Sequence, residues 1–462
     1  MYNAYVTTIK NVRKHPNADR LQLGECFGNT VCVNLNYTEG QIGVYFPTDG
    51  QLSVEFAEAN NLLRKKDADG NNIGGYMDPG KRNVSAIRLR GEKSDGLFLP
   101  LTCLESFGDI STLKVGDVIT VFNGHEICKK YIPRRNHSKH SAGGNKTRKK
   151  KIDIAPLFKE HSDTEQLAYN LSAFKSGDEI EITLKMHGTS QRTGYLPVFK
   201  EYKRTLKDRI LRREGTPVYD WGYVSGTRRT VLENYDGGYY GSNEFREQHS
   251  KFFEGKLWKG EEVFYEVVGF THTGVGIMAT ANNKKINDEE FVKQYGETTT
   301  FSYGCTPDGC NTNELFKFIE YDNNEIPPHI IREPQSDIYV YRMTMTNEDG
   351  NVVEYTPDFM RYRCEQMGVK TVPVFWKGEI PALNLAEQTH GEWVKKQAEY
   401  FYDGPDPIGK THIREGVVVR ILNRPKFTAY KHKNFAFKVL EGIIKDTADA
   451  PDMEEAEGLE NE

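Results

Sequence analysis

The sequence lacks any long apolar run. No stretch of the 462 residues approaches the roughly 18 apolar residues of a transmembrane helix, and no apolar segment near the N-terminus is typical of a signal peptide. The seven cysteines are odd in number and lie scattered at positions 26, 32, 103, 128, 305, 310 and 364. Such cysteines in a chain this large are not typical of a disulfide-stapled secreted domain. We therefore expect a soluble, cytoplasmic or otherwise intracellular protein with no membrane partner.

The sequence also lacks an overall positive charge, since its formal net charge is −5. The charges are unevenly placed, however. Lys129–Lys151 holds ten lysines or arginines and no acid, whereas Asp446–Glu462 holds eight carboxylates and no basic residue. The first segment is a candidate for phosphate contact or for a solvated hinge, and the second predicts a disordered tail.

Short Val, Ile, Tyr and Phe runs bounded by Gly, Asn and Asp predict an α+β protein with many strands and few, short helices. The length exceeds what one hydrophobic core usually supports, so we expect at least two domains. The predicted organisation is a small β-barrel module over 1–126, a basic linker over 127–155, a larger domain over 156–445 and an acidic tail over 446–462.

The candidate nucleophile lies at the end of a predicted strand. Glu179–Leu184 alternates polar and apolar residues, and Lys185-Met186-His187-Gly188 follows it directly. A lysine beside a glycine turn at a strand end is open to a ligand. Attack on the α-phosphorus of a nucleotide requires a neutral amine, and burial or a nearby cation can lower the pKa of a lysine from its usual value of about 10.4.

This tetrapeptide resembles motif I of the covalent nucleotidyltransferases, the superfamily of ATP-dependent ligases and mRNA capping enzymes, in a form common among RNA ligases. The later motifs of that superfamily follow in order. The similar segments are Ser225–Arg229, Val263–Gly269, Ile338–Tyr341, Arg414–Arg420 and Phe435–Val439. The N-terminal module, with its His15–Leu21 string, resembles the OB module of Deinococcus-type RNA ligases.

The resemblance implies an N-terminal OB-like β-barrel followed by a nucleotidyltransferase (ATP-grasp-like ligase) domain of antiparallel sheets with flanking helices. It implies an ATP-dependent RNA ligase that stores AMP on Lys185 and joins 3′-hydroxyl and 5′-phosphate ends, with ATP and Mg²⁺ or Mn²⁺ as cofactors. The expected partners are RNA ends, including those of a nicked duplex, and no obligate protein partner is evident. The implied site residues are catalytic Lys185, His187 and Lys438, nucleotide-binding Arg228, Arg229, Glu266, Tyr341 and Glu415, and metal-binding Glu415 and Glu266.

One position departs from the family pattern. Motif V usually carries two lysines separated by one residue, but Ala436 occupies the first of these positions and leaves Lys438 alone. Lys431 and Lys433 are the nearby alternatives. Taken singly, each acidic or aromatic site residue is also explained as an ordinary strand residue, so the ordered set carries the prediction.

Two further features and two other functions stay open. The basic run from Lys203 to Arg213 is either a guide for nucleic acid or a solvated helix surface, and Cys305 with Cys310 lacks the second ligand pair of a structural zinc site. A DNA ligase or a capping-type nucleotidyltransferase is one alternative, and a non-catalytic RNA-binding protein is another. The long segment between Thr271 and Pro328 has no role in this interpretation.

Overall fold

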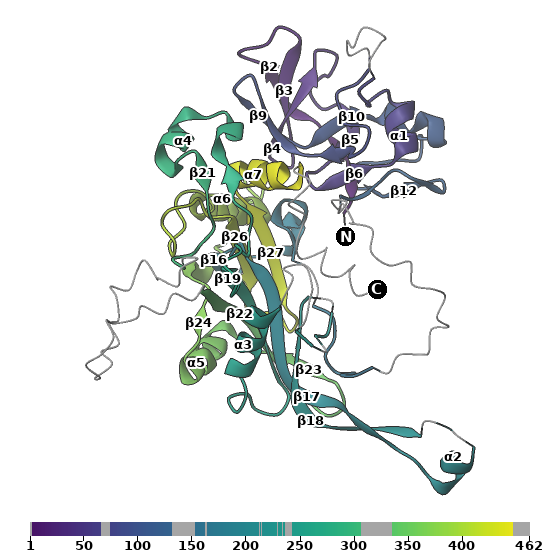
Figure 1. The fold of residues 1–462 in the computed structure, drawn as a ribbon. Helices are drawn as coiled ribbons and strands as arrows, with labels where there is room; N and C mark the ends of the chain where they lie inside the picture. Colours follow the sequence, from purple (N-terminus) through teal and green to yellow (C-terminus); the bar gives the residue numbers. More distant parts are fainter. Residues whose placement is uncertain are drawn as a thin grey trace. The chain divides into compact units, whose positions relative to one another are not determined.

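The computed structural model describes residues 2–65, 74–131, 153–161, 164–211, 213, 215–228, 230–232, 234–235, 243–305 and 335–446. Most of the predicted basic linker and nearly all of the acidic tail lie outside these residues, as do Arg229 and Cys310. The described chain packs as two units (Figure 1). The first unit draws on Met1–Asn136, Ala281–Thr299 and Lys433–Asp452, and the second on His137–Thr280 and Thr300–His432. Both are discontinuous in sequence, and the expected domain boundaries stay predictions.

The first unit is built mainly from short antiparallel strands. Its longest sheet has the order β10-β5-β1-β11, and smaller sheets have the orders β2-β3-β4, β14-β6-β7, β8-β9, β12-β13 and β20-β21. The strands are β1 (Ala4–Thr8), β2 (Lys10–Lys14), β3 (Leu21–Cys26), β4 (Asn29–Asn34), β5 (Ile42–Phe46), β6 (Gly50–Leu52), β7 (Asn83–Val84), β8 (Ala86–Leu89), β9 (Glu92–Asp95), β10 (Leu97–Pro100), β11 (Val118–Ile119), β12 (Val121–Phe122), β13 (His125–Glu126), β14 (Cys128–Lys130), β20 (Ala281–Asn282) and β21 (Thr298–Thr299). The helices are α1 (Val54–Ala59), η1 (Leu101–Phe107), η4 (Asn283–Ile286), α4 (Glu289–Tyr295) and α7 (Phe435–Asp446).

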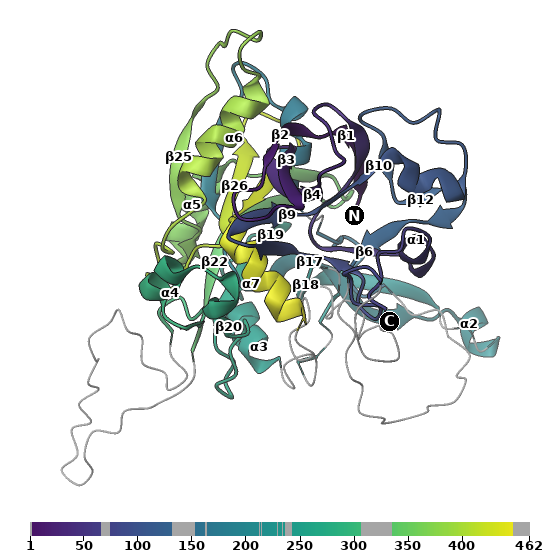
Figure 2. The ribbon, with the colours of Figure 1, turned by 90° about the horizontal axis from the view of Figure 1, so that it is seen from above.

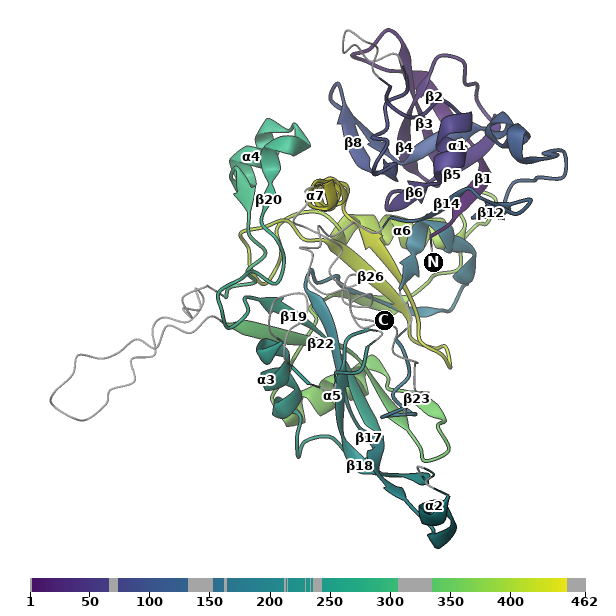
Figure 3. The ribbon, with the colours of Figure 1, turned by 45° about the vertical axis from the view of Figure 1, so that its right-hand side comes forward.

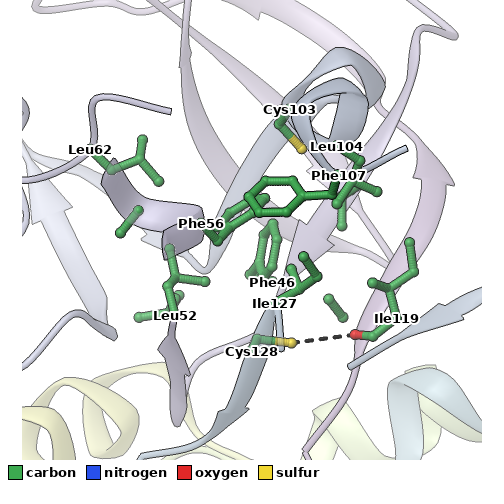
Figure 4. Close-up of a cluster of buried hydrophobic side chains, with 14 of the residues drawn as sticks. Phe46, Leu52, Phe56, Leu62, Cys103, Leu104, Phe107, Ile119, Ile127 and Cys128 are labelled. Carbon is green, nitrogen blue, oxygen red and sulfur yellow. Dashed lines mark hydrogen bonds between the residues drawn. The ribbon is translucent and has the colours of Figure 1, made fainter. Parts of the chain in front are cut away.

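An aromatic core holds the first unit together. The ring of Phe56 packs against those of Phe46 and Phe107, with centroids 5.4 and 5.9 Å apart (Figure 4). The Cys128 thiol donates a hydrogen bond to the carbonyl of Ile119 at 3.3 Å in the same core. Burying aromatic rings contributes the largest apolar areas available to a small core, so these contacts account for the stability of a unit that otherwise consists of very short strands.

The second unit consists of two larger sheets. A five-stranded sheet has the order β15-β27-β26-β16-β25, and a six-stranded arrangement has the order β18-β17-β19-β22-β23 with β24 beside β22 (Figures 1 and 2). The strands are β15 (Glu165–Gln166), β16 (Glu179–Leu184), β17 (Thr189–Lys203), β18 (Thr216–Gly226), β19 (Glu261–Gly269), β22 (Ser336–Thr346), β23 (Val352–Glu354), β24 (Lys370–Thr371), β25 (Val374–Glu379), β26 (Gly416–Ile421) and β27 (Thr428–Lys433). The helices are η2 (Leu167–Tyr169), η3 (Leu171–Ala173), α2 (Leu206–Ile210), α3 (Glu244–Phe252), α5 (Pro357–Met367) and α6 (His390–Phe401).

Each large sheet buries one face against helices. The isoleucines of β16 pack with Val394 and Ala398 of α6, and Val263, Tyr265 and Val267 of β19 pack with residues of α3 and α5. The predicted strand Glu179–Leu184 therefore has the bounds and the buried face that its alternation indicated. The mixed α+β class, with mainly antiparallel sheets and few helices, is confirmed, whereas the OB-like barrel stays a prediction. None of the described helices combines the length and apolar character needed to cross a membrane.

Candidate active site

The Lys185–Gly188 turn joins the two large sheets of the second unit. It runs from the end of β16 to the start of β17, and the backbone N–H of Lys185 donates to the carbonyl of Gly416 at 3.0 Å. Gly188 lies so close to β19 that a Cβ there would be 2.4 Å from the carbonyl oxygen of Val267. Only glycine permits this approach of two backbones, which explains the glycine that follows the candidate nucleophile.

The Lys185 amine pairs with the carboxylate of Glu415. Lys185 Nζ is 2.7 Å from Glu415 Oε1, and the Glu415 side chain is only 2% exposed while that of Lys185 is 23% exposed. Glu415 immediately precedes β26, the strand that pairs with β16. The register of these two strands thus brings together residues 230 positions apart in the sequence. A half-buried ion pair of this kind holds the amine in a fixed place.

His187 lies near the second oxygen of the same carboxylate. Its Nδ1 lies 3.6 Å from Glu415 Oε2, and its ring meets the edge of Phe301 at a centroid distance of 4.6 Å. The backbone N–H of His187 donates to the hydroxyl of Tyr303 at 2.7 Å. Phe301 and Tyr303 therefore support the turn that carries Lys185, although no sequence motif pointed to either residue.

Tyr303 is surrounded by carboxylates. Its ring is 3% exposed, and burial raises the pKa of Tyr303, with Asp406, Glu415 and Glu266 raising it further. The hydroxyl thus stays protonated at neutral pH and keeps one proton to donate while it accepts from His187. Glu266 and Glu415 therefore both lie near enough to Tyr303 to raise its pKa.

A buried Asp and His lie behind Tyr303. The His412 ring packs edge-on against Tyr303 at 4.7 Å, and Asp406 Oδ1 accepts from the backbone N–H groups of Ile408 and Gly409. Burial raises the pKa of Asp406 and lowers that of His412. Both residues were missed from the sequence, because a lone Asp and a lone His in a loop carry no pattern.

Glu266 and Tyr341 share one face of the six-stranded arrangement. Ser190 on β17 lies directly opposite Glu266 on β19, and the Ser190 and Tyr341 hydroxyls are 3.1 Å apart. Opposite residues of an antiparallel pair project to the same face. Ser190 follows Lys185 by only five residues. The sheet face that carries Glu266 and Tyr341 therefore lies next in sequence to the candidate nucleophile.

The predicted cationic residues are more dispersed. Arg228 lies just after β18, where its carbonyl accepts the backbone N–H of His161, and Arg229 is outside the described residues. Lys438 lies on α7 in the first unit, with its Nζ 2.6 Å from Asp95 Oδ2. Lys431 lies on β27 in the second unit, on the strand beside β26.

The acidic residues suit a hard divalent cation. Glu415 and Glu266 supply the carboxylate oxygens that Mg²⁺ and Mn²⁺ prefer. Among the described residues no group of three or more His, Cys, Asp and Glu side chains is arranged to hold a metal. These residues therefore fit a metal that takes most of its ligands from nucleotide phosphates and water, as Mg²⁺ commonly does.

Comparisons with known proteins point to one fold. The chain superposes on a point mutant of Naegleria gruberi RNA ligase with ATP and Mn at a TM-score of 0.51 and 17% identity, covering 94% of this chain and 98% of that one. A second mutant of the same enzyme, with AMP and Mn, gives a TM-score of 0.53 at 16% identity over 94% and 97% of the two chains. The chain has the fold of an RNA ligase.

A third structure of that ligase, with PPi, has the same RNA ligase fold at a TM-score of 0.50, 16% identity and coverage of 94% and 97% of the two chains. No protein-family profile and no curated protein matches the sequence. The shared fold thus extends over nearly the whole of both chains.

Proposed function

We propose that the protein is an ATP-dependent RNA ligase that joins 3′-hydroxyl and 5′-phosphate ends through a lysyl-AMP intermediate. The observation that carries the proposal is the contact of the Lys185 amine with Glu415, beside His187, in a chain with an RNA ligase fold. An amine held at the end of a strand beside a carboxylate is positioned to attack a nucleotide, and transfer of its proton to that carboxylate would make it nucleophilic.

The reaction would proceed in three transfers. The Lys185 nitrogen forms a bond to the α-phosphorus of ATP, the bond from that phosphorus to the bridging oxygen breaks, and pyrophosphate leaves. A 5′-phosphate oxygen then attacks the same phosphorus and releases the lysine. A 3′-hydroxyl oxygen finally attacks the 5′-phosphorus, the sugar–phosphate bond forms, and AMP leaves.

The chain's own residues have distinct tasks in this scheme. Glu415 positions the Lys185 amine at 2.7 Å and lies where it can take the proton that the amine must lose. His187, on the same turn, would orient the phosphates, and Tyr341 with Arg228 would hold the base and the ribose. A divalent metal bound through Glu415 and Glu266 would neutralise charge on the phosphates.

The sheet order bears on the choice among the candidate phosphate-binding lysines. Lys431 and Lys433 are separated by one residue, as in the family pattern, and they lie on β27 beside the strand that Glu415 precedes. Lys433 pairs with Glu441 at 2.6 Å in the first unit. We infer that Lys431 is the better candidate for the α-phosphate than Lys438, which the sequence resemblance favoured.

The first unit and the substrate are assigned by the family resemblance. By resemblance the N-terminal strands would form an OB-like module that binds RNA, and the group would be that of the Deinococcus-type ligases. A DNA ligase or a capping-type enzyme would differ in its substrate ends or in its use of GTP. A non-catalytic RNA-binding protein would form no covalent adenylate.

Labelling with ATP that carries a radioactive α-phosphate tests the proposal. With Mg²⁺ or Mn²⁺ we expect label on the wild-type chain, none on Lys185→Ala, and full labelling of the control Lys200→Ala, whose lysine is exposed on β17. Label retained by Lys185→Ala would exclude this nucleophile. Lys431→Ala and Lys438→Ala, compared in the same assay, identify the phosphate-binding lysine by the larger loss of rate. Sealing of single-stranded, splinted and nicked ends then separates RNA from DNA ligation.

A further inference from the structure

A long β-hairpin extends beyond the six-stranded arrangement of the second unit. β17 pairs with β19 only from Thr189 to Gly194, whereas its pairing with β18 continues outward to Lys203 opposite Thr216. We call residues 195–223 the arm; it comprises the outer parts of β17 and β18 and the short helix α2 at the tip. Figures 1 and 3 show the arm projecting from its sheet. At roughly 3.3 Å per residue, it reaches about 30 Å from Gly194 to Lys203.

The arm is supported by aromatic rings rather than by further strands. Tyr195 and Tyr223 stack at 4.6 Å at its base, and Phe199 meets Tyr202 and Tyr219 farther out at 5.1 and 6.2 Å. A two-stranded hairpin is at best marginally stable by itself. The ring contacts therefore add side-chain packing to the paired strands of the arm.

The outer part of the arm carries an excess of positive charge. Residues 198–220 contain seven lysines and arginines against four carboxylates. Two of the carboxylates already have partners within the arm, because Asp220 pairs with Lys200 at 2.7 Å and Asp208 accepts from Thr205 at the start of α2. Three of the exposed cations are Lys203, Lys207 and Arg213. Cations on a projecting hairpin are suited to a phosphate backbone.

The inner ends of the two strands that form the arm lie next in sequence to candidate active-site residues. β17 begins at Thr189, directly after the Lys185–Gly188 turn, and β18 ends at Gly226, two residues before Arg228. The same two strands thus hold the nucleotidyl-transfer residues at one end and the exposed cations at the other. An extended polyanion such as a nucleic-acid duplex has the length and charge to contact both ends.

We propose that the arm binds the phosphate backbone of the RNA substrate at a distance from the ends being joined. At the roughly 2.8 Å rise per base pair of an A-form RNA duplex, an arm of about 30 Å corresponds to about eleven base pairs. The contact is therefore remote from the chemistry, independent of sequence, and available only to substrates long enough to reach it. This inference rests on the proposed function, because it assumes that RNA ends are bound at Lys185.

The test compares two triple variants that remove equal charge. The arm variant carries Lys203→Ala, Lys207→Ala and Arg213→Ala. The control carries Lys251→Ala, Lys370→Ala and Lys396→Ala, which remove exposed lysines from α3, β24 and α6. Affinity for a nicked RNA duplex is measured over a range of salt concentrations, and sealing is measured on substrates of different length. Adenylate formation from ATP alone is measured in parallel.

We expect the arm variant to form adenylate at the wild-type rate but to bind a long duplex at least tenfold more weakly. Because each phosphate contact contributes up to about 0.9 to the slope of log affinity against log salt, that slope should fall by about two to three. The sealing defect should disappear when fewer than about eleven base pairs lie on each side of the nick, because such a duplex is too short to reach the arm. The control variant should show none of these changes.

Several outcomes would overturn the inference. Equal binding by the arm and control variants would do so, as would a defect that is the same for short and long substrates. A changed oligomeric state of the arm variant in light scattering would assign the arm to a protein contact instead. Failure of wild-type adenylation would contradict the proposed function, whereas the salt dependence of binding would still decide whether the arm contacts RNA.

Discussion

Removing the hydroxyl of Tyr303 tests how much the fixed conformation of the Lys185–Gly188 turn contributes to the rate of adenylate formation. In Tyr303→Phe the backbone N–H of His187 loses an acceptor that lies 2.7 Å away, beside a ring that is 3% exposed. A buried donor left without its partner costs about 1–3 kcal/mol. If the turn must keep its conformation for Lys185 to attack, that cost corresponds to about a 5- to 150-fold slower adenylation.

The assay is the single-turnover rate of label transfer from ATP to the chain. Because burial raises the pKa of Tyr303, the hydroxyl is protonated over the whole working range, so the loss should be the same at pH 7 and at pH 9. The matched control is Tyr355→Phe, which removes another buried hydroxyl, one that donates to Glu261 at 3.0 Å. That variant should lose stability but keep its rate.

Adenylation by Tyr303→Phe within twofold of the wild-type rate would refute a role for this hydroxyl in positioning the turn. An equal loss of adenylation rate in Tyr303→Phe and Tyr355→Phe would also refute that role. The loss would then reflect a general destabilisation of the second unit rather than the position of the turn.

Two further predictions concern stability. Arg192→Met should lower the free energy of unfolding by about 3–5 kcal/mol, because it removes the partner of Glu262, which lies 2.9 Å from Arg192 and is 5% exposed. Chemical denaturation should show that the double variant Arg192→Met/Glu262→Leu recovers much of this loss. A loss below about 1 kcal/mol in Arg192→Met would contradict the importance of the buried pair. Burial lowers the pKa of His249 to about 4. Between pH 6.5 and pH 4 the unfolded chain therefore binds a proton at this histidine that the folded chain does not bind. The free energy of unfolding should consequently fall by about 2 kcal/mol from pH 7 to pH 5. His249→Gln should remove most of that slope, and an unchanged slope would exclude His249 as its source.

The strands that carry the candidate site could be predicted from the sequence because their residues alternate. Glu179–Leu184 and Val263–Gly269 both lie in strands, β16 and β19, and the first has the predicted bounds. The position of Glu415 beside Lys185 also followed from the motif order, although the contact itself required the register of β16 and β26. Periodicity thus predicted the strands, and the motif order named two candidate site residues, Lys185 and Glu415, that the structure brings into contact.

The supporting residues could not be predicted, because they reach the turn from irregular segments. Phe301 and Tyr303 lie outside any helix or strand, shortly after the two-residue strand β21, and Asp406 and His412 lie in a loop. Their relation to His187 arises only from tertiary packing. The long segment that begins at Thr271, which had no role in the sequence interpretation, therefore supplies two of the residues that support the candidate nucleophile.

The discontinuity of the two packing units determines how the protein can be dissected. A fragment that ends near residue 131 would lack α7 and 281–299, and so would lose the partners of Asp95 and Arg88, which are Lys438 and Asp288. A fragment that begins near residue 153 would instead carry those two segments without the strands they pack on. Truncations at the apparent domain boundary should therefore yield poorly folded pieces, and loss of activity in such a piece would not locate the RNA-binding surface. Point variants of the intact chain are the appropriate tools.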